Sequence, residues 1–392
     1  MQTALRTTRF QESMIREMTR LALQSGAINL SQGYPDFDPP PEVVEAAATA
    51  LRAGVNQYTV TWGYPPLRGR LAELYTSRLG WDVHPDEHVT ITCGVSEAIC
   101  ASLLAVLNPG DEVILIEPAH ENFRPAALFA GAEPVPVPLD RPAYHLDADR
   151  LRAAVTPRTR ALILNTPHNP TGRVFAGEEL AAVIDVVTRH DLVLITDEIY
   201  DHILYDGRRH VSPGSLEALR DRTITIGGLG KTYAVTGWRL GYAIAPEPLA
   251  ASVRAVHDFL TICAPTPLQA AAVAALSLPA SYYAEMLAAY HQRRDLMLAS
   301  LSGLGFRATS PEGAYYVMAA YGDLPLSQAK WDALTFARWL TTEVGVAVVP
   351  GGHFYGDHRL GEGVVRFAFC KRLATLQEAA ERMQQGFARA AH

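Results

Sequence analysis

The stretch around which this chain is organised reads Ile226-Gly-Gly-Leu-Gly-Lys231-Thr-Tyr-Ala-Val-Thr-Gly-Trp-Arg239-Leu-Gly-Tyr242. The β-branched run at 223–226 predicts a strand that ends at the loop, and the glycines at 227, 228 and 230 would let the backbone pass close to a bound group. Desolvation in such a loop would lower the pKa of Lys231 and keep part of it neutral, as a Schiff-base nucleophile requires. Taken alone, the loop favours a tight turn with a solvated lysine, because glycine-rich patterns are common.

Length and composition indicate a globular protein with two domains. The chain has 392 residues, of which 48% are hydrophobic and 19% charged, too many for one small core and typical of folded proteins. The net charge of −7 argues against a nucleic-acid or anionic-membrane partner. No apolar run approaches the roughly 18 residues that span a bilayer. Glu12 and Glu17 interrupt the arginines of the first 25 residues, and no apolar segment follows, so we expect no export signal.

The cysteines predict neither disulfide bonds nor a metal site. Cys93, Cys100, Cys263 and Cys370 form no CxxC pair, and no cluster of histidine and cysteine has zinc spacing. We therefore expect a cytoplasmic protein whose cysteines are reduced and serve as small buried residues.

Alternating strands and helices from about residue 89 predict a mostly parallel sheet. A strand is expected at 89–92, and four short apolar runs at 113–116, 161–164, 192–195 and 223–226 indicate strands buried on both faces. Each of these four is followed by unusual residues, at 117–118, 165–172, 197–200 and 227–231. Because ligands bind at the carboxyl ends of such strands, the four clusters point to one pocket.

The remaining pattern predicts an α/β protein with a large domain, whose mostly parallel sheet is flanked by helices, and a smaller α+β domain. Helices are expected at 12–25, which Gly26 ends, and at 42–53, 97–107, 280–301, 331–343 and 373–390. The aromatic, turn-rich stretch 56–68 is expected to be a loop. Strands are expected near 314–319, 346–349 and 364–369. We expect an N-terminal arm at 1–45 that completes the small domain, a large domain at 46–285 and the small domain at 286–392.

Several motifs in order resemble a known family. They are Asn165-Thr-Pro-His-Asn169-Pro-Thr-Gly172, Asp197-Glu-Ile-Tyr200, and Lys231 with Arg239. Together they resemble the class I pyridoxal-phosphate aminotransferases of fold type I, over nearly the whole chain. Within that class, Ile28-Asn-Leu-Ser-Gln-Gly33-Tyr-Pro-Asp-Phe and Gln57-Tyr58-Thr, with Gly63-Tyr-Pro-Pro-Leu, are similar to the kynurenine/glutamine/methionine aminotransferase branch.

The resemblance implies a catalytic role for residues at three strand ends. Lys231 would form the Schiff base with pyridoxal phosphate and then act as the base that moves the substrate proton. Asp197 would pair with the pyridine nitrogen and keep it protonated. Tyr200 and Asn169 would hydrogen-bond the phenolic oxygen of the cofactor.

The resemblance also implies which residues bind the cofactor phosphate and the substrate carboxylate. The backbone N–H groups of Val95 and Ser96, with the Ser96 hydroxyl, would bind the phosphate at a helix start, and Arg239 would add a bidentate charge. Tyr58 resembles the tyrosine that reaches the phosphate of a neighbouring subunit, which implies a homodimer with a shared active site. The substrate would be bound by Gly33, Asn169 and Arg366, of which Arg366 resembles the arginine that holds the α-carboxylate.

Each assignment has a structural alternative. Asp197 could cap a turn, Tyr200 could be a packed aromatic, Ser96 could be a helix cap, and the two arginines could form ordinary ion pairs. Taken singly, Ser96 and Tyr58 favour the structural interpretation, and His168 is interpreted as structural. Taken together, the motifs favour the functional interpretation for Lys231, Asp197, Asn169, Tyr200 and Arg239.

Two positions depart from the family pattern. Many relatives carry a phosphate-binding serine three residues before the lysine, and here that position is Gly228. A hydrogen bond to a charged group is worth about 1.5–3 kcal/mol, which Ser96, Thr232 or water would have to replace. The residue that stacks on the cofactor ring is usually aromatic, and here it is His120, with Phe123 three residues on. An imidazole can stack, but its charge would add pH dependence.

The expected activity is transfer of an amino group from glutamine, methionine, an aromatic amino acid or kynurenine to a 2-oxo acid, by a ping-pong mechanism. We identify no second arginine for a dicarboxylic side chain, which disfavours aspartate as donor. A group of aromatic residues would suit an apolar side-chain pocket or the core: Tyr34, Tyr64, Phe123, Trp238, Phe354 and Tyr355.

Other activities stay open at this point. A cysteine-conjugate β-lyase would use the same lysine and differ only in its products. A nucleotide-binding oxidoreductase would need GxGxxG after a strand, and the glycines at 227–230 lack the full spacing. A regulatory module would need a DNA-binding domain, for which the chain has no basic segment.

Overall fold

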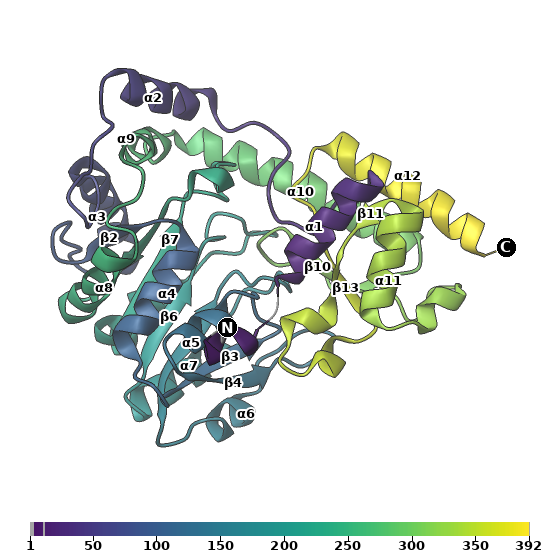
Figure 1. The fold of residues 1–392 in the computed structure, drawn as a ribbon, viewed down its shortest axis with the longest axis horizontal. Helices are drawn as coiled ribbons and strands as arrows, with labels where there is room; N and C mark the ends of the chain where they lie inside the picture. Colours follow the sequence, from purple (N-terminus) through teal and green to yellow (C-terminus); the bar gives the residue numbers. More distant parts are fainter. Residues whose placement is uncertain (1–3, 11, 392) are drawn as a thin grey trace.

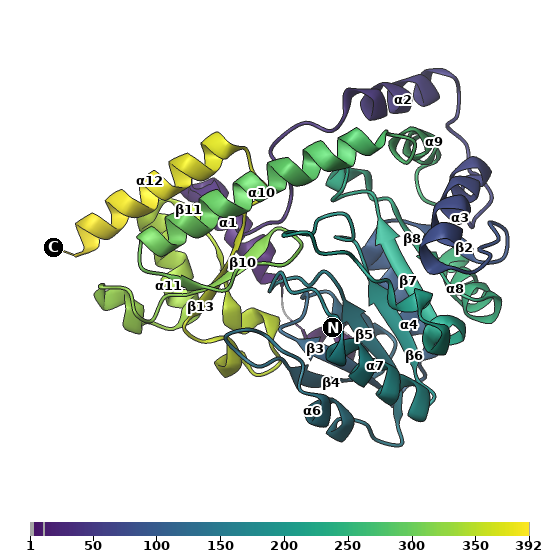
Figure 2. The same cartoon turned by 180° about the vertical axis from the view of Figure 1, so that it is seen from behind.

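A large sheet and a small sheet are connected by one long helix, α10 (Ala280–Gly303), in the computed structural model of this chain (Figures 1 and 2). The structure describes residues 4–10 and 12–391. Residues 1–3 and 11 of the predicted N-terminal arm, and residue 392 of the predicted small domain, lie outside the described residues. No helix within the described residues combines the length and the apolar character needed to cross a membrane.

Seven strands of the described chain form the large sheet, in the order β2-β8-β7-β6-β5-β3-β4. Strand β8 runs antiparallel to both of its neighbours, and the other pairs are parallel. The predicted mostly parallel sheet is therefore confirmed. The strands are β2 (Val89–Thr92), β3 (Glu112–Glu117), β4 (Glu133–Pro138), β5 (Thr159–Asn165), β6 (Val193–Asp197), β7 (Thr223–Gly228) and β8 (Gly241–Ile244).

Sequence patterns did not predict β4 and β8. Strand β4 reads Glu-Pro-Val-Pro-Val-Pro, and proline is expected only at the edge of a sheet because it donates no ladder hydrogen bond. Its place at the edge, beside β3 alone, accommodates those prolines. Strand β8 begins two residues after Arg239, so the signature stretch turns back immediately and pairs with β7.

Helices cover both faces of the large sheet, as the apolar strands require. Alternate residues of the central strands face opposite ways: Leu162 and Leu194 pack in the same cluster as Val183 of α7 (Glu178–Arg189). Ile163 and Ile195 pack instead with residues of α4 (Val95–Val106), α5 (Phe123–Phe129) and α8 (Glu247–Leu260). The other helices of this part are α2 (Pro41–Arg52), α3 (Pro65–Leu79), α6 (Ala148–Ala153) and α9 (Thr266–Ala275).

Two predicted boundaries in this part were wrong in ways that bear on the site. Helix α4 begins at Val95, two residues before the predicted start, because Gly94 takes the left-handed φ of 80° that lets the strand turn directly into the helix. The region 56–68, predicted as a loop, turns into α3 at Pro65, where proline is well suited to the first helical position.

The small part is an antiparallel sheet with helices against it. Its order is β12-β13-β10-β9, and the run at 346–349, predicted as one strand, is divided between β11 and β12 in separate sheets. The elements are β9 (Arg307–Ala308), β10 (Tyr316–Ala320), β11 (Val346–Ala347), β12 (Val349–Pro350), β13 (Val364–Ala368), α11 (Ala333–Trp339) and α12 (Leu373–Ala390).

The N-terminal segment lies against this small part (Figure 1). Helix α1 (Met14–Ser25) ends at Gly26 in the left-handed conformation, as predicted. Strand β1 (Ile28–Asn29) then pairs with β11, and Leu30 O accepts a hydrogen bond from Ala368 N at 2.8 Å. This arrangement brings residues 30–34 to the large sheet. The domain boundaries at 45 and 285 stay predictions.

Strands β7, β6, β5 and β3 are neighbours in the sheet and run parallel. The four clusters of unusual residues that follow them therefore lie at one edge of the sheet, which faces the small part.

Candidate active site

A cavity of about 490 Å³, here called the inner cavity, lies at that edge of the sheet. Residues from both parts of the molecule and from the N-terminal segment line it. Those predicted from the sequence are Gly33, Val95, Ser96, His120, Asn169, Asp197, Tyr200, Lys231 and Arg239. The structure thus brings together nine of the predicted site residues.

Lys231 reaches the cavity from the turn after β7. Its Nζ donates a hydrogen bond to Gly33 O at 2.9 Å. Its pKa is lowered to about 8, mainly by desolvation; Arg239 acts in the same direction, whereas Cys370 and Asp197 act in the opposite direction. A sizeable fraction of Lys231 is therefore neutral at neutral to mildly alkaline pH, which suits an amine that must act as nucleophile and base.

Asp197 is the last residue of β6, and its buried carboxylate borders the same cavity. It accepts a hydrogen bond from Ile199 N at 3.2 Å, and no other donor to it is found in the described part of the chain. Desolvation raises its pKa to about 7. The carboxylate therefore has unused hydrogen-bonding capacity toward the cavity, where a cationic partner would stabilise its ionised form.

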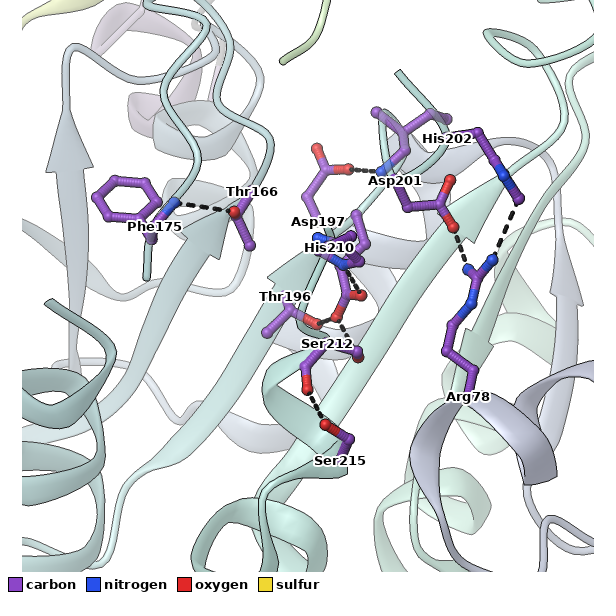
Figure 3. Close-up of polar contacts among 12 residues, drawn as sticks. Arg78, Thr166, Phe175, Thr196, Asp197, Asp201, His202, His210, Ser212 and Ser215 are labelled. Carbon is purple, nitrogen blue, oxygen red and sulfur yellow. Dashed lines mark hydrogen bonds and ion pairs between the residues drawn. The ribbon is translucent and has the colours of Figure 1, made fainter. Parts of the chain in front are cut away.

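The opposite side of the same strand end is crowded with partners (Figure 3). Glu198 is fully buried, and it accepts hydrogen bonds from Thr196 Oγ1 at 2.7 Å and Ser212 Oγ at 2.8 Å. His210 Nε2 lies 2.6 Å from its other oxygen. We call Thr196, Glu198, His210 and Ser212 the far-face cluster. None of its members is among the cavity-lining residues.

The first turn of α4 and Arg239 form a second polar region of the cavity. The N–H groups of Val95 and Ser96 lie at a helix start, where the helix offers no carbonyl partners and its dipole favours anions. A Cβ atom at Gly94 would stand only 2.6 Å from Arg239 Nη2, so the guanidinium packs directly on the glycine. The Ser96 hydroxyl accepts from Asn122 Nδ2 at 3.1 Å. This region is suited to a phosphate group.

Tyr200 and Asn169 line the cavity through contacts that link it to the small part. The hydroxyl of Tyr200 lies 3.0 Å from that of Tyr316 in β10. Asn169 Oδ1 accepts a hydrogen bond from Arg366 Nη1 at 2.9 Å. Arg366 is fully buried behind the lining, donates to Ser31 O, and keeps Nε without a partner among the described residues. The unpartnered Nε marks unused capacity for an anion.

His120 borders the cavity after β3, and its ring lies 5.6 Å from that of Phe123. Desolvation lowers its pKa to about 3, and the charges of Arg366, Lys231 and Arg16 act in the same direction. The imidazole is therefore neutral at physiological pH. A titrating imidazole, which the sequence led us to expect as a source of pH dependence, is not found at this position.

Some predicted residues lie elsewhere. Tyr58 is 78% exposed and does not line the inner cavity. His168 is buried, with its Nδ1 2.7 Å from Thr171 Oγ1, a structural setting. Tyr34 and Phe123 line the inner cavity, while Tyr64 and Trp238 do not line it and pack against a hydrophobic cluster.

The glycines of the signature stretch approach protein atoms. A Cβ at Gly227 would stand 2.5 Å from the ring of Tyr242. A Cβ at Gly228, where relatives carry serine, would stand 2.8 Å from Ile199 Cδ1 and 3.1 Å from Leu240 O. These glycines therefore permit close packing against protein neighbours. Thr236 borders the cavity and Thr232 does not, so of these two threonines Thr236 is the better placed to replace the missing serine hydroxyl.

Sequence reasoning missed the residues contributed by other regions. Ser13, Arg16 and Gln32 come from the N-terminal segment, and Tyr316 comes from the small sheet. Gly33 requires the absence of a side chain, because a Cβ there would meet the Tyr316 hydroxyl at 1.9 Å. The glycine at 33 was the one local signal of this close approach.

Comparisons with known proteins agree with this geometry. A family model described as aminotransferase class I and II matches residues 25–383. The methionine aminotransferase of Escherichia coli (strain K12) is 35% identical, over 95% of this chain and 95% of that protein. Kynurenine–oxoglutarate transaminase 1 of Mus musculus is 35% identical, over 94% of this chain and 93% of that protein. The solved structure of N-succinyldiaminopimelate aminotransferase from Mycobacterium tuberculosis is similar with a TM-score of 0.94 and 39% identity, covering 98% of this chain and 100% of that chain.

Proposed function

The chain belongs to the class I and II aminotransferases, which depend on pyridoxal phosphate, and from that premise we propose that it works by a ping-pong reaction with Lys231 as the proton carrier. An amino acid gives up its amino group and leaves as a 2-oxo acid, and a second 2-oxo acid then takes the group. The observation that supports this assignment is that Lys231 and Asp197 border one cavity from adjacent parallel strands. The predicted enzyme class and fold are confirmed by the family match, and the residue roles are our proposal.

The lining of the inner cavity fits pyridoxal phosphate. The under-partnered carboxylate of Asp197 suits a protonated pyridine nitrogen. The first turn of α4, with the guanidinium of Arg239 packed on Gly94, suits the phosphate. The amine of Lys231, with its pKa lowered to about 8, suits a carbonyl group. When bound, the cofactor supplies an electron sink for the α-carbon of the substrate.

The residues of this chain would then divide the work. Lys231 Nζ would take the proton from the substrate α-carbon and deliver it to the C4′ carbon of the cofactor. Asp197 would keep the pyridine nitrogen protonated. Tyr200 and Asn169 would donate hydrogen bonds to the phenolic oxygen, and the neutral ring of His120 would pack against the cofactor ring. Arg366 and the backbone at Gly33 bind the substrate α-carboxylate, supported by the unpartnered Arg366 Nε.

The preferred amino donors are proposed from the relatives and the cavity. Methionine, glutamine, aromatic amino acids and kynurenine stay our expected donors, since relatives named for methionine and kynurenine share 35% identity with this chain. Tyr34, Phe123 and Ile15 give part of the inner cavity an apolar lining suited to such side chains. A relative named for N-succinyldiaminopimelate adds longer, acylated donors to the candidates.

A homodimer that shares its active sites is proposed from an exposed apolar patch. Tyr58 and Val60 are 78% and 47% exposed, and Phe259 and Ile262 are 94% and 47% exposed. The two segments lie side by side, because His257 Nε2 is 2.9 Å from Thr61 O. The patch also lies near the region suited to phosphate. Cys263, which follows Ile262, has its carbonyl oxygen 4.0 Å from the Sγ of Cys93, and Cys93 directly precedes Gly94. This position would let Tyr58 reach the phosphate site of a second subunit.

A cytoplasmic location is part of the same proposal. The free thiols of Cys93, Cys100, Cys263 and Cys370 support it, since a reducing compartment keeps such groups reduced.

The first test is an absorption spectrum of the purified protein, before and after addition of L-methionine or L-glutamine. A near-ultraviolet or visible band that moves to shorter wavelength with the amino acid supports the proposal. Lys231→Ala should lose the band after dialysis, whereas Lys371→Ala, which removes a second lysine bonded to Tyr34 O at 2.7 Å, should keep it. A protein that stays colourless with added pyridoxal phosphate would overturn the assignment. Analysis of the products then separates transamination from β-elimination.

A further inference from the structure

A second cavity of about 920 Å³, here called the outer chamber, adjoins the inner cavity. The two lie side by side, because they share six lining residues: Ser13, Arg16, Ser96, His120, Glu121 and Asn122. The walls of the outer chamber come from the N-terminal segment, from α5 and from residues 353–358 of the small part. The inner cavity has to hold the cofactor and the reacting end of the substrate. The outer chamber is therefore extra space next to the reacting end.

The N-terminal wall is held in place by specific contacts. Arg9 forms an ion pair with Glu133 at 2.6 Å, and the ring of Phe10 meets that of Phe129 edge-on at 5.4 Å. The Ser13 hydroxyl donates to Glu121. These contacts tie the segment to β4, α5 and the loop before α5, so the chamber is a built feature of the fold.

Two charged groups that line the outer chamber, Arg16 and Glu121, form no ion pair within the described residues. Its carboxylates have partners: Glu12 pairs with Arg20, Glu17 with Arg338 at 2.6 Å, and Glu117 with Arg124 at 3.1 Å, while Glu121 accepts from Ser13. Its arginines are Arg9, Arg16 and Arg124. Arg9 and Arg124 are paired, and Arg16 forms no ion pair within the described residues.

Arg16 also stands where the two cavities meet. Its exposed side chain borders both of them, and its positive charge is one of the causes that lower the pKa of His120. An extended side chain that leaves the Lys231 region for the outer chamber would therefore pass this guanidinium. An unpaired guanidinium at such a place binds a carboxylate with charge-assisted, bidentate hydrogen bonds.

Polar atoms without partners support a polar occupant. The Tyr355 hydroxyl and His353 Nδ1 are buried and have no hydrogen-bond partner among the described residues, and both residues line the outer chamber. Buried polar groups in folded proteins are normally satisfied by protein, water or ligand. Desolvation lowers the pKa of His353 to about 4, so its ring is neutral and can accept a hydrogen bond.

We propose that the outer chamber is a subsite for the distal part of a long amino donor that ends in a carboxylate, and that Arg16 recognises this carboxylate. The proposal rests on the proposed aminotransferase function and adds a substrate class to it. It supplies the second arginine that the sequence alone did not identify, and it places that arginine on α1, outside every sequence motif. Methionine or phenylalanine would leave the chamber to water.

The binding arm of the test uses the holoenzyme and straight-chain acids as probes. Calorimetry compares pentanedioate, hexanedioate and heptanedioate with monocarboxylates of the same lengths. At least one dicarboxylate should bind the wild type at least 10-fold more tightly than its monocarboxylate. Arg16→Gln should abolish that difference, and Arg16→Lys should retain part of it. Equal binding of both kinds of acid to the wild type, or an undiminished preference in Arg16→Gln, would overturn the subsite.

The kinetic arm compares L-2-aminoadipate, L-2-aminoheptanedioate and N6-succinyl-L-lysine with L-methionine as donors. In Arg16→Gln, the ratio of kcat/KM for the best carboxylate donor to that for methionine should fall at least 10-fold, mainly through KM. Arg52→Gln on α2 removes another helical arginine that borders neither cavity, and it should leave the ratio unchanged. An unchanged ratio in Arg16→Gln would overturn the subsite alone. A holoenzyme that transaminates no donor would count against the proposed function, and the binding arm would still decide the subsite.

Discussion

Asp197 and Glu198 are neighbouring carboxylates with opposite surroundings. Asp197 faces the inner cavity with a single backbone donor at 3.2 Å. Glu198 lies in the far-face cluster, where two hydroxyl groups and His210 surround it within 2.8 Å. Successive side chains of an extended strand point to opposite faces. One strand end therefore carries an acid with few hydrogen-bond partners on one side and an acid with several partners on the other.

The difference shows how the fold distinguishes function from support. A buried polar group that lacks partners is costly, so it persists where a ligand supplies the missing interactions. A group that has all its partners contributes to stability and has little capacity left for a ligand. The same contrast separates Arg366, whose Nε has no partner in the described chain, from Arg78, which pairs with Asp201 behind the site.

The largest expected effect is on catalysis, in Asp197→Asn. The amide cannot hold the pyridine nitrogen protonated, so kcat should fall by about 10³-fold, the scale seen when a preorganised electrostatic partner is removed. Steady-state kinetics with methionine measures the loss. Thermal unfolding of the cofactor-free variant should show no loss of stability. A variant with near wild-type kcat would break the comparison.

A smaller effect is expected from the two arginines. Arg366→Lys keeps a charge but loses the planar fork, and kcat/KM should fall by about 10- to 100-fold for every amino donor, since such hydrogen bonds are worth about 1.5–3 kcal/mol. Arg78→Lys is the matched change behind the site, where the Asp201 pair is structural. Its kcat/KM should stay within about threefold of the wild type. Equal losses in both variants would contradict the distinction.

The pH dependence of stability should sharpen the comparison further. In the cofactor-free protein the pKa of Asp197 is raised to about 7 from its ordinary 3.8. The folded state therefore holds a proton that the unfolded state has already released, and this contribution is lost as the pH rises through 7. Between pH 5 and pH 7 the free energy of unfolding should fall by roughly 2–3 kcal/mol more in the wild type than in Asp197→Asn. Urea unfolding at both pH values measures this change, and an equal change in the free energy of unfolding in the two proteins would refute the prediction.

The smallest effect on activity is expected in Glu198→Gln. The amide reproduces the shape of the side chain but presents an N–H₂ group to one of its former donors. The free energy of unfolding should fall by about 1–3 kcal/mol, while kcat changes by less than about threefold. Parallel urea unfolding and kinetics test both halves. A large loss of kcat with intact stability would place Glu198 in the catalytic apparatus and remove the contrast with Asp197.

The sequence predicted the large sheet and the part of the site that its strands carry. Residues 197–200 and 227–231 follow buried apolar runs that predict neighbouring parallel strands. Because the carboxyl ends of such strands lie on the same side of a sheet, the sequence placed Asp197 and Lys231 together. The site residues that come from the N-terminal segment and from the small part could not be placed in this way. Lys231 Nζ meets Gly33 O across 198 positions of the chain, and Arg366 meets Ser31 O across 335. No local sequence pattern distinguishes Arg16 from the other arginines of the N-terminal segment, because the lack of an ion-pair partner is visible only in the folded structure.

The short pairing of β1 with β11 has a consequence for the order in which parts of the site can form during synthesis. Ile28 can pair with Val346 only after the whole large sheet has been translated, and Leu30 O can then accept the hydrogen bond from Ala368 N. Domains tend to fold as they emerge during synthesis, the N-terminal part first. Strands β2 to β8 can therefore assemble while residues 28–33 still wait for their partners. The strand ends that carry Asp197 and Lys231 can therefore form early, and residues 28–33 can bring Gly33 to Lys231 only after β11 and β13 have left the ribosome.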